Sequence, residues 1–305
     1  MIITRRALLQ GAGGLVLGST GLASYAVAVE PGFMLDVTRY RIQPRTWPAG
    51  LDLRIAVIAD IHACEPWMPA SRIRHIAEVA NSLKPDLVVL LGDFNGGHRM
   101  VTGPVTPQQW GEALSVLEAP LGVHAILGNH DWWHGPLPRM KSDGADSIRR
   151  ALGHMNASVL ENDALRLTKD GKPFWLVGLG DQLAHPLGRY RFRGEDDLDE
   201  ALQEVTDNAP IVLLAHEPYI FHRVPDRVAV TLCGHTHGGQ VNLPLVGPVT
   251  ANRRFGSDLV YGHLVSGDRH IVISAGLGTS IAPVRFMRPP EVVDLVISGP
   301  PAATS

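Results

Sequence analysis

The sequence has few cysteines and no excess of basic residues. Only two cysteines occur among 305 residues, Cys64 and Cys233, which excludes a framework of several disulfides. One disulfide between them is an open alternative, but we expect packing roles because each lies next to a candidate metal-ligand block. Lysine and arginine together number 27 against 30 acidic residues, so the formal net charge is -3. A mildly acidic protein binds nucleic acid poorly without specificity, and we expect no nucleic-acid partner.

Internal repeats and low-complexity tracts are also absent from the sequence. The chain is 45% hydrophobic and contains six tryptophans, which is enough apolar material for one large domain with a single core. We expect this domain to cover residues 29–298. Residues 299–305 consist of small residues and proline, and they are expected to form a loose tail.

The N-terminal 28 residues resemble a twin-arginine export signal. Arg5 and Arg6 precede a stretch without charge that runs to residue 29, and small residues around Ala28 suit a cleavage site. The expected location is therefore the periplasm or cell envelope, with the twin-arginine export machinery as a partner. An uncleaved membrane anchor is the alternative, because the uncharged stretch approaches spanning length. Several glycines in the stretch weaken that alternative.

Five short polar blocks each follow an apolar run rich in β-branched residues. The runs are residues 53–59, 87–91, 123–127, 211–215 and 228–233. The blocks supply Asp60, His62, Asp93, Asn129, His130, Asp131, His216, His235 and His237. Open α/β sheets build their sites at the carboxyl ends of strands, so these side chains are expected to meet there. Carboxylate, imidazole and amide groups suit a pair of manganese, iron or zinc ions, and no thiolate is needed.

The order of strand and helix patterns predicts an α/β fold. Helices are expected over residues 69–83, 107–117 and 142–154, alternating with strands, which favours parallel βαβ units. The second half has short strands and fewer helices, of which residues 195–205 are the clearest. We therefore expect two mixed β-sheets packed face to face and flanked by helices, with residues 36–43 as an edge strand.

The blocks D-x-H, G-D, G-N-H-D, a lone histidine after a strand, and G-H-x-H together resemble the calcineurin-like metallophosphoesterases. The order is kept from Asp60 to His237. The run from Gly234 to Gln240, GHTHGGQ, is similar to the exported bacterial branch of that superfamily. The resemblance implies a four-layer αββα sandwich and a dimetal phosphoesterase.

The resemblance also implies a role for each residue of the blocks. Asp60, His62 and His237 would bind the first metal, and Asn129, His216 and His235 the second, with Asp93 bridging both. A metal-bridging hydroxide would then attack phosphorus in line. His130 would assist the leaving group or a phosphate oxygen, and Asp131 would orient the His130 imidazole. A structural histidine at a turn is the alternative for His130, and a helix N-cap is the alternative for Asp131.

Loops beyond the ligand blocks supply the candidates for substrate binding. His98 and His134 follow the second and third blocks, and Trp132 could form an apolar wall. Arg191 and Arg285 could bind a further phosphate or carboxylate through their planar guanidinium groups. Surface or packing roles are the alternatives for all five.

These features favour hydrolysis of a phosphodiester or pyrophosphate bond in a small molecule or a lipid. Some members of the superfamily cleave UDP-diacylglucosamine, so peripheral membrane association is also open. A phosphomonoesterase with the same site is the first alternative. A non-catalytic metal-binding scaffold is the second, although scaffolds tend to lose ligands that are intact here.

Overall fold

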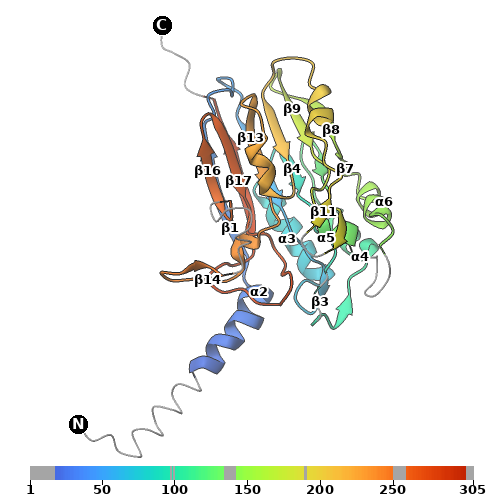
Figure 1. The fold of residues 1–305 in the computed structure, drawn as a ribbon, viewed down its shortest axis with the longest axis vertical. Coiled ribbons are helices and arrows are strands. Elements are labelled where there is room, and N and C mark those ends of the chain that lie inside the picture. The colour runs from blue at the N-terminus through green and yellow to red at the C-terminus, as the bar shows by residue number, and fades with distance from the viewer. Residues whose placement is uncertain are drawn as a thin grey trace, which may run out of the picture.

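The computed structural model describes residues 18–96, 98, 100–133, 142–188, 191–249 and 259–299. Two six-stranded sheets pack face to face, and helices cover their outer faces (Figure 1). Both sheets are mixed, since each contains parallel and antiparallel neighbours. The predicted fold class, two mixed sheets flanked by helices, is confirmed.

The first sheet has the strand order β1-β18-β2-β4-β6-β7. Its strands are β1 (Asp36–Ile42), β18 (Glu291–Ile297), β2 (Leu53–Ile58), β4 (Leu87–Leu90), β6 (Val123–Ala125) and β7 (Ser158–Val159). β2, β4, β6 and β7 run parallel. β18 lies between β1 and β2, parallel to β1 and antiparallel to β2. Within the described residues, the last strand thus completes the sheet that the first two strands begin.

The second sheet has the strand order β16-β17-β13-β12-β9-β8. Its strands are β16 (Gly262–Ser266), β17 (Arg269–Ile273), β13 (Val228–Cys233), β12 (Ile211–Leu214), β9 (Lys172–Gly178) and β8 (Asp163–Lys169). The four central strands are parallel, and both edge strands are antiparallel to their neighbours.

The core between the sheets explains why the strands read as unbroken apolar runs. Alternate residues of β2 face opposite sides: Leu53 and Ile55 pack between the sheets, whereas Ala56 and Ile58 pack against helices. A strand that is buried on both faces needs apolar residues at every position. Strand bounds could therefore be predicted from sequence to within a residue or two.

Three helices cover the first sheet and two shorter ones the second. α3 (Ala70–Ser82), α4 (Pro107–Leu114) and α6 (Asp146–His154) share a core with the first sheet, and α3 buries the expected face of Ile73, Ile76, Ala77 and Ala80. α4 begins with a capping box between Thr106 and Gln109. α7 (Leu198–Gln203) and η2 (Pro218–His222) pack on the second sheet.

Short elements surround the carboxyl ends of the parallel strands. They are α5 (Asn129–Trp133), η3 (His237–Gly239), β3 (Cys64–Glu65), β5 (Gly103–Pro104), β10 (His185–Gly188), β11 (Arg191–Arg193), β14 (Asn242–Leu243) and β15 (Gly247–Pro248). β14 and β15 form a hairpin that projects from the body of the molecule (Figure 1). Cys64 and Cys233 are both buried and free, so the alternative of a disulfide between them is wrong.

Residues 18–24, η1 (Tyr25–Val29) and α2 (Glu30–Phe33) form one N-terminal helical segment. The segment projects from the same end of the molecule as β14 (Figure 1). It is attached to the domain on both sides of the expected cleavage position after Ala28. The carbonyl oxygen of Ala26 accepts a hydrogen bond from the Arg285 N–H (2.9 Å), and the Glu30 carboxylate accepts from the amides of Met287 and Arg288.

None of the helices within the described residues is both long enough and apolar enough to cross a membrane. Of the expected tail at 299–305, only Gly299 lies among the described residues.

Candidate metal centre

The polar blocks meet where the two sheets end together. Asp60 and Asp93 lie shortly after β2 and β4, Asn129 begins α5 after β6, and His216 and His235 follow β12 and β13. All these strands are parallel within their sheets, so their carboxyl ends share one edge. Segments that are far apart in the sequence thereby contribute to one site.

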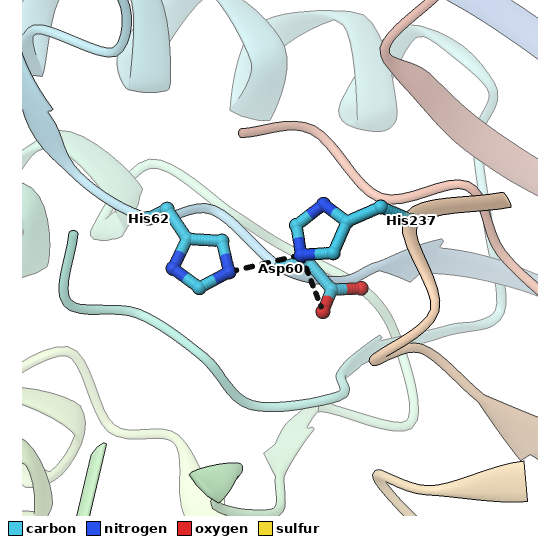
Figure 2. Close-up of side chains that lie close together, drawn as sticks. All are labelled: Asp60, His62 and His237. Carbon is cyan, nitrogen blue, oxygen red and sulfur yellow. Dashed lines mark hydrogen bonds and ion pairs between the residues drawn. The ribbon is translucent and has the colours of Figure 1, made fainter. Parts of the chain in front are cut away.

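Asp60, His62 and His237 form the first cluster (Figure 2). The Nε2 atoms of His62 and His237 are 3.1 Å apart, and His237 Nε2 lies 3.6 Å from Asp60 Oδ1. All three side chains are buried, at 0%, 0% and 4% exposure. The figure shows the two imidazoles and the carboxylate directed toward one another.

Asp93, His216 and His235 form the second cluster. Asn129 belongs with it, because its Oδ1 lies 2.9 Å from His235 Nδ1. Gly128 makes the close approach here: a Cβ atom at this position would lie 2.5 Å from Asp93 Oδ1 and 2.7 Å from His216 Cε1. Only glycine fits without moving a ligand side chain.

One carboxylate oxygen connects the two clusters. Asp93 Oδ2 lies 3.4 Å from His62 Nε2 and 3.2 Å from His216 Nε2. The other oxygen, Oδ1, accepts a hydrogen bond from the His130 N–H at 2.8 Å. Asp93 is therefore placed to share one oxygen between two cation sites.

Backbone carbonyls fix the orientation of two histidine rings. His62 Nδ1 faces the carbonyl oxygen of Asn95 at 3.1 Å, and His216 Nδ1 faces that of Leu91 at 2.6 Å. A carbonyl can only accept, so Nδ1 carries a proton in each ring and Nε2 faces the site. This is the arrangement in which a histidine binds a metal, with its second nitrogen held by the protein. Burial, which lowers the pKa of His216, is outweighed by Asp93, so this pKa is raised well above its usual value, and a bound cation has to displace the proton on Nε2.

Burial sets the protonation of the ligands. It lowers the pKa of His62 and of His235 to about 3, against the favourable field of Asp93, so both imidazoles are neutral near pH 7 and able to bind a cation. For Asp93, burial is outweighed by His216, His130 and His62, which hold the pKa of the carboxyl well below its usual range. Burial and the nearby Asp93 raise the pKa of Asp60 to about 7.

Five of the candidate ligands have a left-handed backbone. Asp60, His62, Asp93, His235 and His237 have φ angles of 51°, 45°, 56°, 69° and 52°. Residues other than glycine rarely adopt this region, which costs about 1 to 3 kcal/mol at each position. The packing of the surrounding strands has to hold these residues in place. The strain is concentrated where the side chains must converge.

Asp131 is directed at backbone amides. Its carboxylate accepts hydrogen bonds from the N–H groups of Asp93 (2.9 Å), Phe94 (2.9 Å) and Gly128 (3.0 Å), with Asn95 at 3.4 Å. We expected Asp131 to orient the His130 imidazole; these contacts instead make it the residue that holds together the loops after β4 and β6.

His130 lies beside the first cluster. Its ring packs edge-on against His62 with centroids 4.7 Å apart, and its Nε2 is 3.3 Å from Ser280 Oγ. Trp133, rather than Trp132, flanks it: the Trp133 and His130 rings are 5.3 Å apart, and Trp133 stacks on Phe192. The half-buried imidazole thus adjoins both the ligands and an aromatic wall.

The residues expected to bind substrate are dispersed. Trp132 packs against the core of the first sheet, with His185 at its edge and Arg149 over its ring. His98 is buried against Trp67. Arg191 is exposed on β11, while the neighbouring Phe192 contacts Trp133. His134 lies outside the described residues. These contacts give Trp132 and His98 packing roles, which were among the alternatives for both residues.

Arg285 has a different role from the one expected. It is fully buried (0% exposed), and its guanidinium donates to the carbonyls of Gly278, Ala275 and Arg288. Nη2 also lies 3.4 Å from His237 Nδ1. Because these carbonyls occupy its donors, the prediction that Arg285 binds substrate is wrong. It supports the loop behind the first cluster.

Sequence reasoning missed a carboxyl pair next to the second cluster. Asp181, Glu217 and His216 offer ligand atoms within 4.8 Å of one another, and Glu217 Oε1 lies 3.8 Å from His235 Nδ1. Both carboxyls are buried, which raises the pKa of each. The signal was present in part, since Glu217 directly follows a ligand in an otherwise apolar region.

The donor set fits divalent cations. Within the described residues the clusters contain only carboxylate and imidazole groups, with the Asn129 amide beside them and no thiol; such oxygen and nitrogen donors suit manganese, iron or zinc. Two clusters joined by one carboxylate, at the shared edge of two sheets, define a metal-dependent phosphoesterase. The chain belongs to the family described as calcineurin-like phosphoesterase, whose sequence model matches residues 53–239.

Three curated relatives support this assignment over most of the chain. The phosphodiesterase YaeI of Escherichia coli is 30% identical over 298 residues, covering 96% of this chain and 99% of the relative. An uncharacterized metallophosphoesterase of Aquifex aeolicus is 30% identical over 267 residues, covering 88% and 93%. The UDP-2,3-diacylglucosamine pyrophosphatase LpxG of Chlamydia trachomatis is 27% identical over 315 residues, covering 88% and 90%.

Proposed function

We propose that this protein hydrolyses phosphodiester or pyrophosphate bonds with the help of two divalent cations, manganese, iron or zinc. The observation that carries the proposal is the position of Asp93 Oδ2, 3.4 Å and 3.2 Å from ligand nitrogens of the two clusters. Asp60, His62 and His237 would hold one ion, and Asn129, His216 and His235 the other. When bound, such a pair supplies a water of lowered pKa and stabilises negative charge on a phosphoryl group.

The residues of the chain contribute position and proton transfer. His130 borders the first cluster and is half-buried, so its imidazole can donate a proton to a leaving oxygen or stabilise a phosphate oxygen. Asp131 fixes the loops that carry Asp93 and Asn129 through its hydrogen bonds to amides. Trp133 and Phe192 offer an apolar wall for the group attached to phosphate.

The preference for diesters or pyrophosphates is supported by the names of two relatives, a phosphodiesterase and a pyrophosphatase. A phosphomonoesterase would use the same ligands, so it is the first rival. A non-catalytic scaffold is the second, and the intact donor set argues against it.

The test compares two substrates with one variant. The protein is supplied with Mn²⁺ and given bis(p-nitrophenyl) phosphate or p-nitrophenyl phosphate. We expect the diester to be hydrolysed faster and Asp93→Ala to reduce turnover by about a thousandfold or more, since an anionic bridge between two cations is lost. Faster hydrolysis of the monoester would favour the phosphatase. Turnover that is equal in Asp93→Ala and wild type would refute the proposed site.

We also propose export by the twin-arginine route, supported by Arg5 and Arg6 ahead of an uncharged stretch. This route carries folded proteins, so metals could be loaded before export. The test replaces Arg5 and Arg6 with lysine, which keeps the charge, and follows the protein by cell fractionation. We expect the variant to remain in the cytoplasm. Unchanged export would refute this part of the proposal.

A further inference from the structure

Most of the exposed large apolar side chains gather at one end of the molecule. Ten of the thirteen found within the described residues belong to three segments: the N-terminal helical segment, the β14–β15 hairpin with the residue after it, and the loop between β17 and β18. The ten, which we call the apolar end, are Leu22, Val27, Val29, Phe33, Leu243, Leu245, Val246, Val249, Ile281 and Met287. Single exposed apolar residues are ordinary, but a concentration of this kind marks an interaction surface.

Backbone hydrogen bonds join the three segments into one surface. Phe286 pairs with the start of the hairpin, because its carbonyl accepts from the Asn242 N–H and its N–H donates to the Gln240 carbonyl, both at 2.9 Å. The Arg285 N–H donates to the Ala26 carbonyl at 2.9 Å. Tyr25 packs edge-on against Phe286 with centroids 6.4 Å apart. β14 and α2 accordingly lie at the same end in Figure 1.

The apolar end is continuous with the metal centre. Gln240, three residues after the ligand His237, accepts a hydrogen bond from the Ser280 N–H at 2.7 Å. The Ser280 hydroxyl lies 3.3 Å from His130 Nε2. The next residue, Ile281, is 87% exposed. A surface that receives Ile281 would therefore lie close to the imidazole that we assign to proton transfer.

The charge of these segments favours an anionic lipid surface. Within the described residues, 18–29, 241–249 and 275–290 contain no aspartate or glutamate, and the one carboxylate of the N-terminal helical segment, Glu30, is buried against the amides of Met287 and Arg288. An exposed apolar surface without carboxylates is suited to a bilayer, which offers hydrocarbon below a negatively charged headgroup layer that would repel acidic side chains. Leu245, at the tip of the hairpin, is fully exposed at 107%, which suits insertion into a soft layer.

We propose that the apolar end docks on an anionic lipid surface and so presents the metal centre to phosphoesters at the level of the headgroups. The docking is argued from the exposed residues of the apolar end alone. The inference that the substrate is a lipid-linked phosphoester rests on the proposed function. The apolar end contacts the bilayer, and the substrate is an amphiphile whose phosphate group lies at the surface of the membrane.

The test measures binding of the full chain to vesicles by co-sedimentation. Vesicles of phosphatidylcholine with and without phosphatidylglycerol are compared, using wild type, Leu245→Glu and the matched control Val265→Glu. Val265 is 55% exposed on β16, where it pairs with His270 at the end of β17 remote from the metal centre. We expect binding that requires phosphatidylglycerol, and a fall of about tenfold in the partition constant for Leu245→Glu alone.

Several outcomes would overturn the proposal. They are no binding of wild type to vesicles that contain phosphatidylglycerol, equal binding by Leu245→Glu and wild type, and an equal loss in Val265→Glu. A change of oligomeric state in Leu245→Glu, without loss of vesicle binding, would show that the surface joins two copies of the chain.

Asp93→Ala separates this proposal from the proposed function. We expect it to bind vesicles as wild type does, because the Asp93 side chain is buried and is not part of the apolar end. If the wild type binds vesicles but neither it nor any variant hydrolyses a phosphoester, only the proposed function is refuted and the docking proposal stands. Hydrolysis of a soluble diester is expected to be equal in Leu245→Glu and wild type.

Discussion

The carboxylate of Asp131 determines where two ligand-bearing loops lie. It accepts amide hydrogen bonds from Asp93 and Phe94 in one loop and from Gly128 in the other. Burial and the charge of Asp93 raise its pKa to about 7, so the ionised form is maintained only at a cost in free energy. In return, the buried carboxylate fixes the positions of the two loops that carry Asp93 and Asn129, which candidate metal ligands require.

Asp131→Asn is expected to destabilise the protein. An amide can accept from these N–H groups through one oxygen only, and its NH₂ group would face a further donor, so the free energy of unfolding should fall by about 2 to 3 kcal/mol at pH 8. Urea unfolding in the presence of a chelator measures the change without interference from metals. Asp199→Asn, in the first turn of α7, is the control with an exposed carboxylate. Equal stability of the two variants would contradict the positioning role.

That the candidate ligands meet at one edge could be predicted from sequence, because each block follows a strand that is recognisable as an apolar run. Their assignment to two metals came from the family resemblance. Their backbone conformations could not be predicted. The left-handed φ angles of Asp60 and His237 depend on the loops that surround them. The burial of Arg285 could not be predicted either, because a sequence does not distinguish a buried arginine from an exposed one. The structure shows that carbonyl groups of residues 275–288 enclose the Arg285 guanidinium.

Among the elements, the N-terminal helical segment is the one whose position follows least from sequence. An uncharged stretch after two arginines is typical of a signal, and such patterns carry no information about contacts with the mature domain. The segment nevertheless accepts three hydrogen bonds from the loop that precedes β18, from the N–H groups of Arg285, Met287 and Arg288. Glu30 is 1% exposed, and it caps the amides of Met287 and Arg288 at 3.0 Å and 2.6 Å.

Glu30→Ala should therefore loosen the loop that precedes β18. Two amides lose a charged acceptor, and the free energy of unfolding is expected to fall by about 1 to 3 kcal/mol. Hydrogen exchange should accelerate at Met287 and Arg288 more than elsewhere. Glu78→Ala removes an exposed glutamate of α3 and should leave these rates unchanged. If the two variants exchange equally at these amides, the cap has no role in holding the loop.

Strands β7 and β16 were not predicted, whereas the strands before the ligand blocks and the main helices were predictable because their patterns are local. The strand order was not, since it depends on which runs pair across the whole chain. The hairpin of β14 and β15 was also missed, because Asn242–Leu243 and Gly247–Pro248 are too short to show alternation. Short elements of this kind surround the candidate metal centre, so the loops around it were the least predictable part of the fold.

At the scale of the whole molecule, bound cations should contribute much of the stability. Asp60, Asp93, Asp181 and Glu217 are buried together, and their charges favour a state with divalent ions. Removal of metal by a chelator should lower the free energy of unfolding by roughly 3 to 4 kcal/mol for each ion present at about 100 to 1,000 times its Kd. Thermal unfolding with Mn²⁺ and with chelator measures the difference.

The difference in stability between the protein with Mn²⁺ and with chelator should decrease as the pH falls. The pKa of Asp60 is raised to about 7 without metal, so below pH 7 an ion has to displace its proton. The His62 pKa is lowered to about 3, so that ring adds no competing proton above about pH 4. Stabilisation by Mn²⁺ is expected to be larger at pH 8 than at pH 5.5, because Asp60 is increasingly protonated below pH 7. A difference that is equal at pH 5.5 and 8 would contradict this linkage.

The place of β18 in the first sheet has a consequence for synthesis. Glu291–Ile297 lies between β1 and β2, so the position between these two strands stays empty until more than 230 further residues, up to β18, have been made. A nascent chain cannot close this sheet progressively, and two edges without partners are exposed while it waits. The first sheet can therefore be completed only after Ile297 has left the ribosome, and any cellular factor that shields these edges must act before that point.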